Sequence, residues 1–265
     1  MIDLRFSEEE LEVRREHITT FIRERVDAAG AEGAVLGLSG GIDSTLTAYL
    51  AVEALGAENV HGLVLPARVS SDHHMSDAER VAVDLEMPYD VIEIEPVIDS
   101  LLAAYPEAEG DHVAVGNARA RVRAVLNYLV ANHEDRVVLG TGNRSEAAVG
   151  YFTKYGDGAV DCHPIGNLYK AQVRQLASHV GVPDDLVEKT PTAELWDDQT
   201  DESEMGVDYD TLDSILVTHI DGPLSATATA RHLEVDEETV HQVRAMYEAS
   251  EHKRSVPPAP EPLED

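Results

Sequence analysis

The N-terminal segment of the chain places apolar side chains at helical spacing. Ser7-Glu-Glu-Glu10 has the form of a capping box, in which a serine and a glutamate three residues later satisfy backbone N–H groups at a helix start. The apolar positions that follow are Leu11, Ile18, Phe21, Ile22 and Val26. This spacing predicts an amphipathic helix from Ser7 to about Ala29, with one face packed on the protein core.

After this helix, short apolar runs alternate with longer amphipathic runs. The strand-like runs are Ala34–Leu38, Val60–Leu65, Tyr89–Ile94 and Arg136–Gly140. The helix-like runs are Ser44–Leu55, Ser76–Leu85, Val97–Ala104 and Asn117–Asn132. Because such alternation builds right-handed βαβ units, it predicts an α/β fold with an open parallel sheet of about five strands and helices on both faces.

The remaining part of the chain reads as a loop followed by extra C-terminal helices. Gly150–Pro164 is glycine-rich and aromatic and has no clear period, which indicates a long functional loop. Helical patterns return at Lys170–Val180, Tyr209–His219 and Val235–Ser250. The acidic pairs Asp197-Asp198 and Asp201-Glu202 are interpreted as a solvated loop. We expect one domain over residues 1–257 and a mobile acidic, proline-rich tail over residues 258–265.

The charge balance is strongly acidic. The chain has 51 acidic and 20 basic residues, a formal net charge of −31, and the carboxylates are scattered along it. This composition resembles that of proteins from extreme halophiles, because molar salt shortens the Debye length to about 3 Å and screens the self-repulsion. In dilute buffer the same charge should strain the compact state. It also argues against nucleic acid as a partner, which needs a basic surface.

Other features favour a cytoplasmic protein that does not bind membranes. The apolar runs are all far shorter than the roughly 20 residues that cross a bilayer. The first residues include Asp3, Arg5 and several glutamates, unlike a signal peptide. The single cysteine, Cys162, cannot form an internal disulfide, which fits a reducing compartment.

The segment Gly37-Leu-Ser-Gly-Gly-Ile-Asp-Ser44 joins a predicted strand to a predicted helix. A glycine-rich turn in this position aims backbone N–H groups and the positive end of a helix at one point, where a phosphate can bind. Asp43 indicates Mg²⁺, because a carboxylate beside phosphate is repelled unless a cation lies between them. The segment lacks the Gly-Lys-Ser/Thr ending of a Walker loop. For this motif alone, the alternative is an ordinary strand-to-helix turn.

A second predicted strand also ends in a polar turn, Gly140-Thr-Gly-Asn-Arg-Ser-Glu146. Ligands of open parallel sheets bind beyond the carboxyl ends of the strands, where the strand order reverses. If these two strands are neighbours, Asp43 and Glu146 face a common metal ion and triphosphate.

Several motifs together carry a resemblance to a known family. The glycine-rich loop resembles the SGGxDS loop of the N-type ATP pyrophosphatases, which split ATP into AMP and pyrophosphate. The polar turn at Gly140–Glu146 is a second such motif, and the others are Gly116-Asn-Ala-Arg-Ala-Arg-Val-Arg123, Gly150-Tyr-Phe-Thr-Lys-Tyr-Gly-Asp-Gly158, Pro191-Thr-Ala-Glu-Leu195 and Glu251-His-Lys-Arg254. With these motifs in this order, the chain resembles the ammonia-dependent NAD synthetases from about Ser7 to Pro257. The resemblance implies an adenine-nucleotide alpha-hydrolase-like fold.

The resemblance also implies the site residues. The ATP contacts that it implies are Gly37, Leu38, Ser39, Gly40, Gly41, Ile42, Asp43, Ser44, Thr141, Lys170 and Thr192. The contacts to deamido-NAD⁺ that it implies are Arg121, Lys154, Asp161, His252 and Lys253. The implied ligands of Mg²⁺ are Asp43 and Glu146.

The scarcity of lysine gives a second argument. The only lysines are Lys154, Lys170, Lys189 and Lys253. In a chain that otherwise avoids lysine, each one that is retained is a candidate site residue. Three of them coincide with ligand positions that the resemblance implies, whereas Lys189 does not and is interpreted as a surface residue. The alternative is that the surviving lysines are random surface positions. Arg121 lies on the apolar side of its helix and needs an anionic partner, either the dinucleotide or a structural carboxylate.

The implied reaction is the amidation of deamido-NAD⁺ to NAD⁺ with ammonia. The nicotinate carboxylate attacks the α-phosphate of ATP, pyrophosphate leaves, and ammonia then displaces AMP from the acyl-adenylate. We expect Asp43, Lys170 and Asp157 to be the catalytic residues. Most ammonia is ammonium at neutral pH, so a nearby carboxylate is needed to bind it and take its proton, and Asp157, in the loop at Gly150–Gly158, is our candidate. Free ammonia, or ammonia from a separate protein, supplies the nitrogen. The family forms homodimers, and we expect one here.

Two other classes remain open at this stage. One is a different adenylating pyrophosphatase, such as a tRNA-thiolating enzyme or a guanine-nucleotide synthetase. The other is a non-enzymatic adenine-nucleotide sensor. Cys162 is interpreted as a half-buried thiol rather than an amidase nucleophile, His73-His74 as an exposed helix start, and Trp196 as a packing residue.

Overall fold

The computed structural model describes residues 2–68, 72–191 and 200–260. Its strands are β1 (Gly33–Gly37), β2 (Val60–Val64), β3 (Tyr89–Val91) and β4 (Arg136–Val138). Its α-helices are α1 (Glu8–Ala29), α2 (Ile42–Leu55), α3 (Asp72–Asp84), α4 (Glu95–Ala104), α5 (His112–Glu134), α6 (Arg144–Val149), α7 (Lys170–His179), α8 (Asp184–Val187), α9 (Asp201–Met205), α10 (Tyr209–Ile215), α11 (Ala226–Leu233), α12 (Glu237–Ala249) and α13 (Glu251–Arg254). Short 3₁₀ turns lie at Ala57–Asn59 and Pro106–Ala108, and a π-helix at Leu216–Ile220.

The strands form one parallel sheet in the order β3-β2-β1-β4. The described residues contain four strands, not about five, and each was predicted. At the β4 edge the chain returns only as an isolated parallel bridge between Leu139 and Cys162. The Asp161 carboxylate accepts a hydrogen bond from the Val138 N–H at 2.7 Å. In a fifth strand, a backbone carbonyl oxygen would accept this hydrogen bond. Because the Asp161 side chain accepts it instead, the backbone pairing along β4 does not continue into a full strand.

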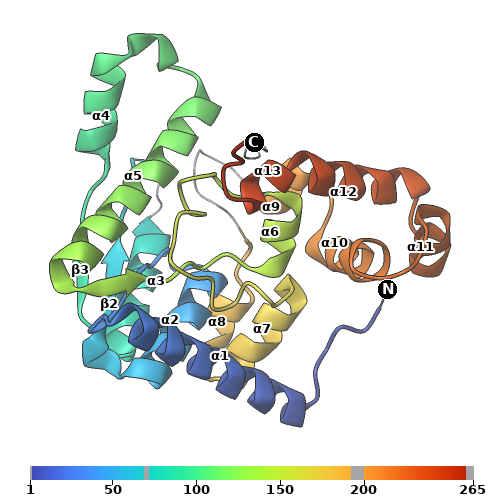
Figure 1. The fold of residues 1–265 in the computed structure, drawn as a ribbon, viewed down its shortest axis with the longest axis horizontal. Helices are drawn as coiled ribbons and strands as arrows, with labels where there is room; N and C mark the ends of the chain where they lie inside the picture. The colour runs from blue at the N-terminus through green and yellow to red at the C-terminus, as the bar shows by residue number, and fades with distance from the viewer. Residues whose placement is uncertain (1, 69–71, 192–199, 261–265) are drawn as a thin grey trace, which may run out of the picture.

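Alternate residues along the strands face two different helix layers. Ala34 and Leu36 pack in a cluster with α1, α2, α3 and α7, whereas Val35 packs with α4 and α5 on the opposite face. Figure 1 shows α4 and α5 on one side of the sheet and α1 and α2 on the other. Successive side chains of a strand point to opposite faces of the sheet, and both faces are covered by helices, as predicted.

The C-terminal helices form a separate packed cluster beside the sheet. Their largest buried side chain is that of Tyr209, which is 1% exposed, and Met205 and Leu216 pack in the same cluster. Figure 1 shows α10, α11 and α12 on the side of the molecule away from α4 and α5. The predicted helix at Tyr209–His219 continues from α10 into the π-helix, and the predicted helix at Val235–Ser250 is α12.

The N-terminal prediction is confirmed in detail. The Ser7 side chain accepts from the Glu10 N–H, and the Glu10 side chain accepts from the Ser7 N–H at 2.8 Å.

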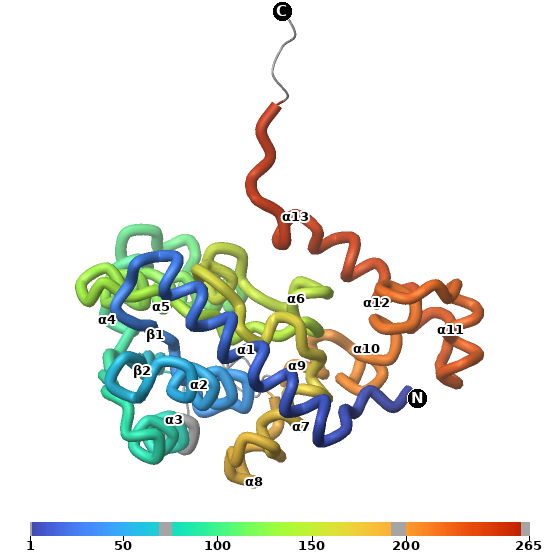
Figure 2. The backbone as a smooth tube through the Cα atoms, turned by 60° about the horizontal axis from the view of Figure 1, so that its bottom comes forward, coloured from blue at the N-terminus to red at the C-terminus, as the bar shows by residue number. Residues whose placement is uncertain are grey.

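After α13 the described chain, through residue 260, projects away from the body in Figure 2. Among the described helices, none combines the length and apolar composition that crossing a membrane requires.

Candidate active site

The glycine-rich loop lies between the end of β1 and the start of α2. Gly40 has a φ of 72°, a conformation that favours glycine, and Gly41 is the N-cap of α2. The Ser39 N–H donates to Ser44 Oγ at 3.2 Å, and the two serine hydroxyls lie 3.0 Å apart. The loop therefore curls over the positive end of α2, as a phosphate-binding turn must.

The second polar turn lies next to this loop because β1 and β4 are neighbours. Asn143 caps α6, and its side-chain amide donates to Asp43 Oδ1 at 2.8 Å. Glu146 occupies the third position of the same helix and completes a capping box with Asn143. The two strands are neighbours, as the sequence argument required, and Asp43 and Glu146 lie at their carboxyl ends.

Lys170, at the start of α7, lies between these carboxylates. Its Nζ is 2.5 Å from Asp43 Oδ2 and 3.3 Å from Glu146 Oε1, and the residue is 1% exposed. Burial alone would lower the pKa of Lys170, but the two carboxylates reverse this effect and raise it. The ammonium group is therefore charged and aimed into the site. Burial raises the pKa of Glu146 to about 7, and Asp43 and Asp201 add to this effect while Lys170 opposes it.

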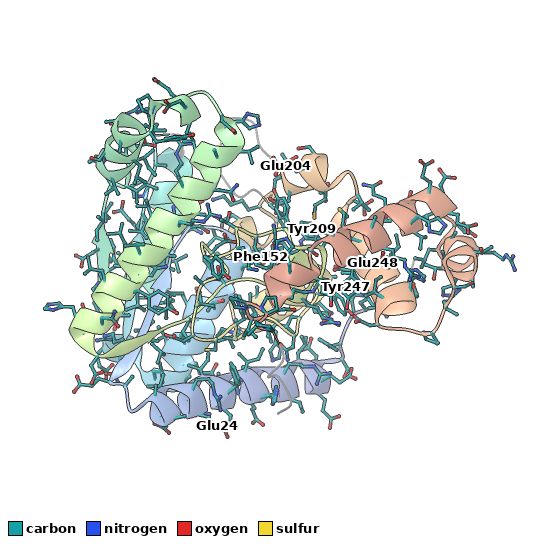
Figure 3. The ribbon with its side chains drawn as sticks, turned by 45° about the horizontal axis from the view of Figure 1, so that its top comes forward. Glu24, Phe152, Glu204, Tyr209, Tyr247 and Glu248 are labelled. Atoms are coloured by element: carbon teal, nitrogen blue, oxygen red, sulfur yellow. The ribbon has the colours of Figure 1, made fainter. Side chains whose placement is uncertain are left out.

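Two residues that the sequence did not assign support this cluster. The Tyr209 hydroxyl lies 2.8 Å from Asp201 Oδ2 and 3.3 Å from Glu146 Oε1. The centre of the Tyr209 ring is 4.9 Å from Lys170 Nζ. Asp201 is 4% exposed, so its interpretation as part of a solvated loop is wrong. Figure 3 shows Tyr209 near the middle of the view, among the C-terminal helices.

A cavity of about 420 Å³ extends from the glycine-rich loop across the sheet edge. The predicted site residues that line it are Gly37, Leu38, Ser39, Gly41, Ile42, Asp43, Ser44, Thr141, Glu146, Asp157, Lys170 and Lys253. Thr192 and Trp196 lie outside the described residues. A volume of this size accommodates a small-molecule substrate.

The loop at Gly150–Gly158 forms a wall of this cavity, and α13 holds it. Lys253 Nζ donates to the carbonyl oxygens of Gly150 at 2.7 Å and Phe152 at 2.8 Å. Lys154 Nζ donates to the carbonyl oxygen of His252. The Arg121 side chain donates to the carbonyl oxygen of Lys154 at 3.3 Å. Four of the residues predicted to bind the dinucleotide therefore gather around one loop.

The two aspartates near this loop differ in setting. Asp157 lines the cavity, its Oδ1 accepts from the Thr153 N–H at 2.9 Å, and desolvation raises the pKa of its carboxyl. Asp161 lies at the sheet edge, where Tyr128 donates to its Oδ1 at 3.0 Å in addition to the Val138 contact. Both oxygens of Asp161 already accept hydrogen bonds from the protein.

Lys189 differs from its sequence interpretation. Its Nζ lies 3.0 Å from the carbonyl oxygen of Gly40 and 2.6 Å from Oδ2 of Asp77, and its side chain is only 14% exposed. It also lines the cavity. Its interpretation as a surface residue unconnected with the site is wrong. The scarcity of lysine, applied to all four lysines alike, was the signal that could have found it.

The sheet order, the glycine-rich loop between β1 and α2 and the lysine between two carboxylates define an α/β protein of the adenine-nucleotide alpha-hydrolase fold. The NAD synthase family matches residues 14–257. The NH(3)-dependent NAD(+) synthetase of Halobacterium salinarum strain R1 is 65% identical over 98% of this chain and 97% of its own length. The chain belongs to the NAD synthase family.

Solved structures agree with this assignment. The NMN synthetase of Francisella tularensis has a TM-score of 0.83 and 35% identity, covering 97% of this chain and 99% of its own. The NH3-dependent NAD synthetase of Campylobacter jejuni has a TM-score of 0.80 and 29% identity, covering 97% of this chain and 100% of its own. The chain therefore shares its whole described fold with enzymes that carry these names.

Proposed function

We propose that this chain makes NAD⁺ from deamido-NAD⁺ and ammonia, with cleavage of ATP to AMP and pyrophosphate. The observation that carries the proposal is the convergence of Lys170, Asp43 and Glu146 beside the glycine-rich loop. In the first step the substrate carboxylate attacks the α-phosphate, and negative charge builds on the departing pyrophosphate. The Lys170 ammonium and the N–H groups of the loop are placed to stabilise that charge.

The carboxylates of Asp43 and Glu146 fit Mg²⁺. Magnesium sites in nucleotide enzymes use one or two protein carboxylates and complete the shell with phosphate oxygens and water. Within the described residues, groups of three or more ligating side chains are absent, so a site that borrows ligands from ATP suits this chain. When bound, Mg²⁺ would neutralise phosphate charge. Asp43 and Glu146 would hold it, and Asn143 would keep Asp43 oriented.

Deamido-NAD⁺ brings two phosphates and a nicotinate carboxylate, so its site needs cations. Arg121, Lys154 and Lys253 surround the loop at Gly150–Gly158 and are our candidates, with His252 and Asp161 as further contacts. A second small cavity, lined by Lys154, Lys253 and Pro257, adjoins this loop. Thr141 lines the main cavity and is assigned with the loop to ATP.

The second step needs ammonia in its uncharged form. Asp157 lines the same cavity as Lys170, and the raised pKa of its carboxyl makes it a better proton acceptor than an ordinary aspartate. We assign it to bind ammonium and take its proton. Ammonia would arrive free or from a separate protein.

We also propose that the chain works as a cytoplasmic homodimer, with residues 1–257 as one catalytic unit. The outer side of α5 exposes apolar residues beside Arg121, with Val125 66% and Leu129 62% exposed. A second copy would cover this apolar face. Light scattering in molar KCl tests the assembly, and Leu129→Glu should yield monomers.

One assay tests the proposed function. The chain is incubated with ATP, Mg²⁺, ammonium and deamido-NAD⁺ in molar KCl, and the products are separated by mass. NAD⁺, AMP and pyrophosphate should appear in equal amounts, and only when the dinucleotide is present. Efficient use of glutamine by the purified chain, or AMP formation without an acceptor, would count against the proposal.

The same assay should also compare two substrates that could accept the amide nitrogen. The similarity to an enzyme named NMN synthetase makes nicotinate mononucleotide the matched competitor. We expect turnover of deamido-NAD⁺ to exceed that of the mononucleotide when the two are supplied together. Preferential conversion of the mononucleotide would move the assignment from NAD⁺ to NMN synthesis.

A further inference from the structure

Lys189 lies beside the glycine-rich loop and lines the same cavity, although it belongs to none of the recognised motifs. Its Nζ contacts the Gly40 carbonyl oxygen at 3.0 Å and Asp77 Oδ2, on α3, at 2.6 Å. The Lys189 and Asp77 side chains are 14% and 6% exposed, so the ion pair is largely withdrawn from water. Three segments that are distant in the sequence therefore meet at one ammonium group.

The contact with Gly40 fixes the orientation of one peptide group. The C=O of Gly40 and the N–H of Gly41 belong to the same planar unit and point in opposite directions. With the carbonyl oxygen held by Lys189, the Gly41 N–H points into the loop, where it donates a hydrogen bond to Ser39 Oγ at 3.2 Å. This peptide joins two glycines, so sterics alone do little to stop it from flipping.

A flipped peptide would harm an anion site. It would turn a carbonyl oxygen, which carries partial negative charge, toward the side where N–H groups must face phosphate. Asp77 holds Lys189 in place from the other side, and the nearest Arg80 nitrogen is 3.9 Å from Asp77 Oδ1. Loss of Lys189 would therefore remove a hydrogen bond from the Gly40 carbonyl and an ion pair from the buried Asp77 carboxylate.

We propose that Lys189 is a positioning residue for the adenylation step, which locks the Gly40–Gly41 peptide with its N–H turned into the phosphate site. The proposal rests on the proposed function, because it assigns the loop to the triphosphate of ATP. Lys189 acts through the backbone and needs no contact with the substrate. Its effect should therefore be confined to ATP and pyrophosphate and should spare the dinucleotide.

Lys189→Met removes the ammonium group and keeps most of the stem. The KM for ATP and the Kd for inorganic pyrophosphate should rise about tenfold, the effect of losing one hydrogen bond to a charged group. The KM for deamido-NAD⁺ should change by less than about twofold, as expected for a site that the contact does not touch. Steady-state kinetics and pyrophosphate calorimetry in molar KCl measure these values.

Two further variants separate positioning from stability. Lys189→Met with Asp77→Asn removes the buried negative charge that has lost its lysine partner, so its Tm should return toward that of the parent chain. Its weak pyrophosphate binding should persist, because the Gly40 carbonyl still lacks its donor. Lys189→Arg keeps a charged donor and should restore part of the affinity. If the double variant regains both properties, or if Lys189→Met weakens ATP and deamido-NAD⁺ equally, the proposal is wrong.

Arg244→Met is the matched control, since it removes one positive charge from an ion pair on the surface. Arg244 and Glu248 are 54% and 61% exposed. This variant should leave both constants unchanged. A parent chain that binds pyrophosphate but forms no NAD⁺ would overturn the proposed function alone, and the calorimetric comparison would still decide the role of Lys189.

Discussion

Lys170 sits in a place that would be unfavourable without its partners. A cation at the start of a helix faces the positive end of the helix dipole, and here the carboxylates of Asp43 and Glu146 offset that cost. Asp43 and Glu146 belong to motifs and Lys170 is one of only four lysines, so the sequence could predict their meeting. Tyr209 and Lys189 make equally direct contacts, but their partners Glu146 and Gly40 lie 63 and 149 positions away. No local pattern encodes such a pairing.

The carboxylates can be separated by role. Asp43→Asn and Glu146→Gln should abolish adenylation, because Mg²⁺ would lose an anionic ligand beside the triphosphate. Asp157→Asn should retain adenylation and lose mainly the ammonia step. Isotope exchange between pyrophosphate and ATP reports adenylation alone, whereas NAD⁺ yield reports both steps. Equal loss of exchange in Asp157→Asn and Asp43→Asn would rule out the ammonia role.

Cys162 should react slowly despite being only half-buried. Burial and the neighbouring Asp161 carboxylate raise the pKa of its thiol to about 11. At pH 8 the reactive thiolate is then roughly 100-fold scarcer than in a free cysteine. Alkylation by iodoacetamide should be correspondingly slow at pH 8 and should accelerate steadily up to pH 11. Rapid labelling at pH 8 would indicate an open, ionised thiol instead.

At the scale of elements, prediction succeeded where burial imposed a period on the sequence. The four strands and the helices between them follow the alternation, and the capping box marks the start of α1. β3 ends at Val91, three residues before the predicted end at Ile94. The helix α11 was missed because its residues, Ala226–Leu233, include only one large apolar side chain. A short helix of that kind is stabilised by its neighbours, which the sequence does not name.

Two glycines of β1 test how tightly the sheet is packed. A Cβ at Gly33 would lie 2.1 Å from the carbonyl oxygen of Asn59, whereas a Cβ at Gly37 would meet nothing closer than 3.7 Å. Gly33→Ala should therefore lower the free energy of unfolding by about 1–3 kcal/mol or more. Gly37→Ala should leave it nearly unchanged. Urea titration of both variants checks this, and similar midpoints would mean that the strand shifts to relieve the contact.

At the scale of the whole molecule, net charge should govern stability. The chain carries 51 acidic and 20 basic residues. Figure 3 shows one of the acidic side chains, that of Glu24, pointing outward from α1. The sheet and its helices give the molecule a buried core, but the fold does not bring enough cations to neutralise its surface. The composition predicted this property, because net charge depends on no detail of the fold.

Circular dichroism should show a folded chain in molar KCl and progressive loss of structure in dilute buffer. Mg²⁺ and ATP should restore part of the signal at low salt, since ligands that bind the native state stabilise it. Sucrose at matched viscosity serves as the control, because it does not screen charge. A chain that stays fully folded at low ionic strength would refute the halophilic interpretation and leave the enzymatic assignment intact.

The hydrogen bonds from Lys253 of α13 to the loop at Gly150–Gly158 can form only late in the synthesis of the chain. Synthesis runs from the N-terminus, so the sheet, the glycine-rich loop and Lys170 leave the ribosome before Lys253 does. A chain broken off before α13 would hold the parts that handle ATP while the acceptor loop lacks its clamp. Translation that stops early would then yield a protein able to hold ATP but poor at coupling its cleavage to amide formation. On the proposed assignment of this loop to deamido-NAD⁺, completion of α13 would therefore be needed before ATP cleavage can be coupled to amide formation.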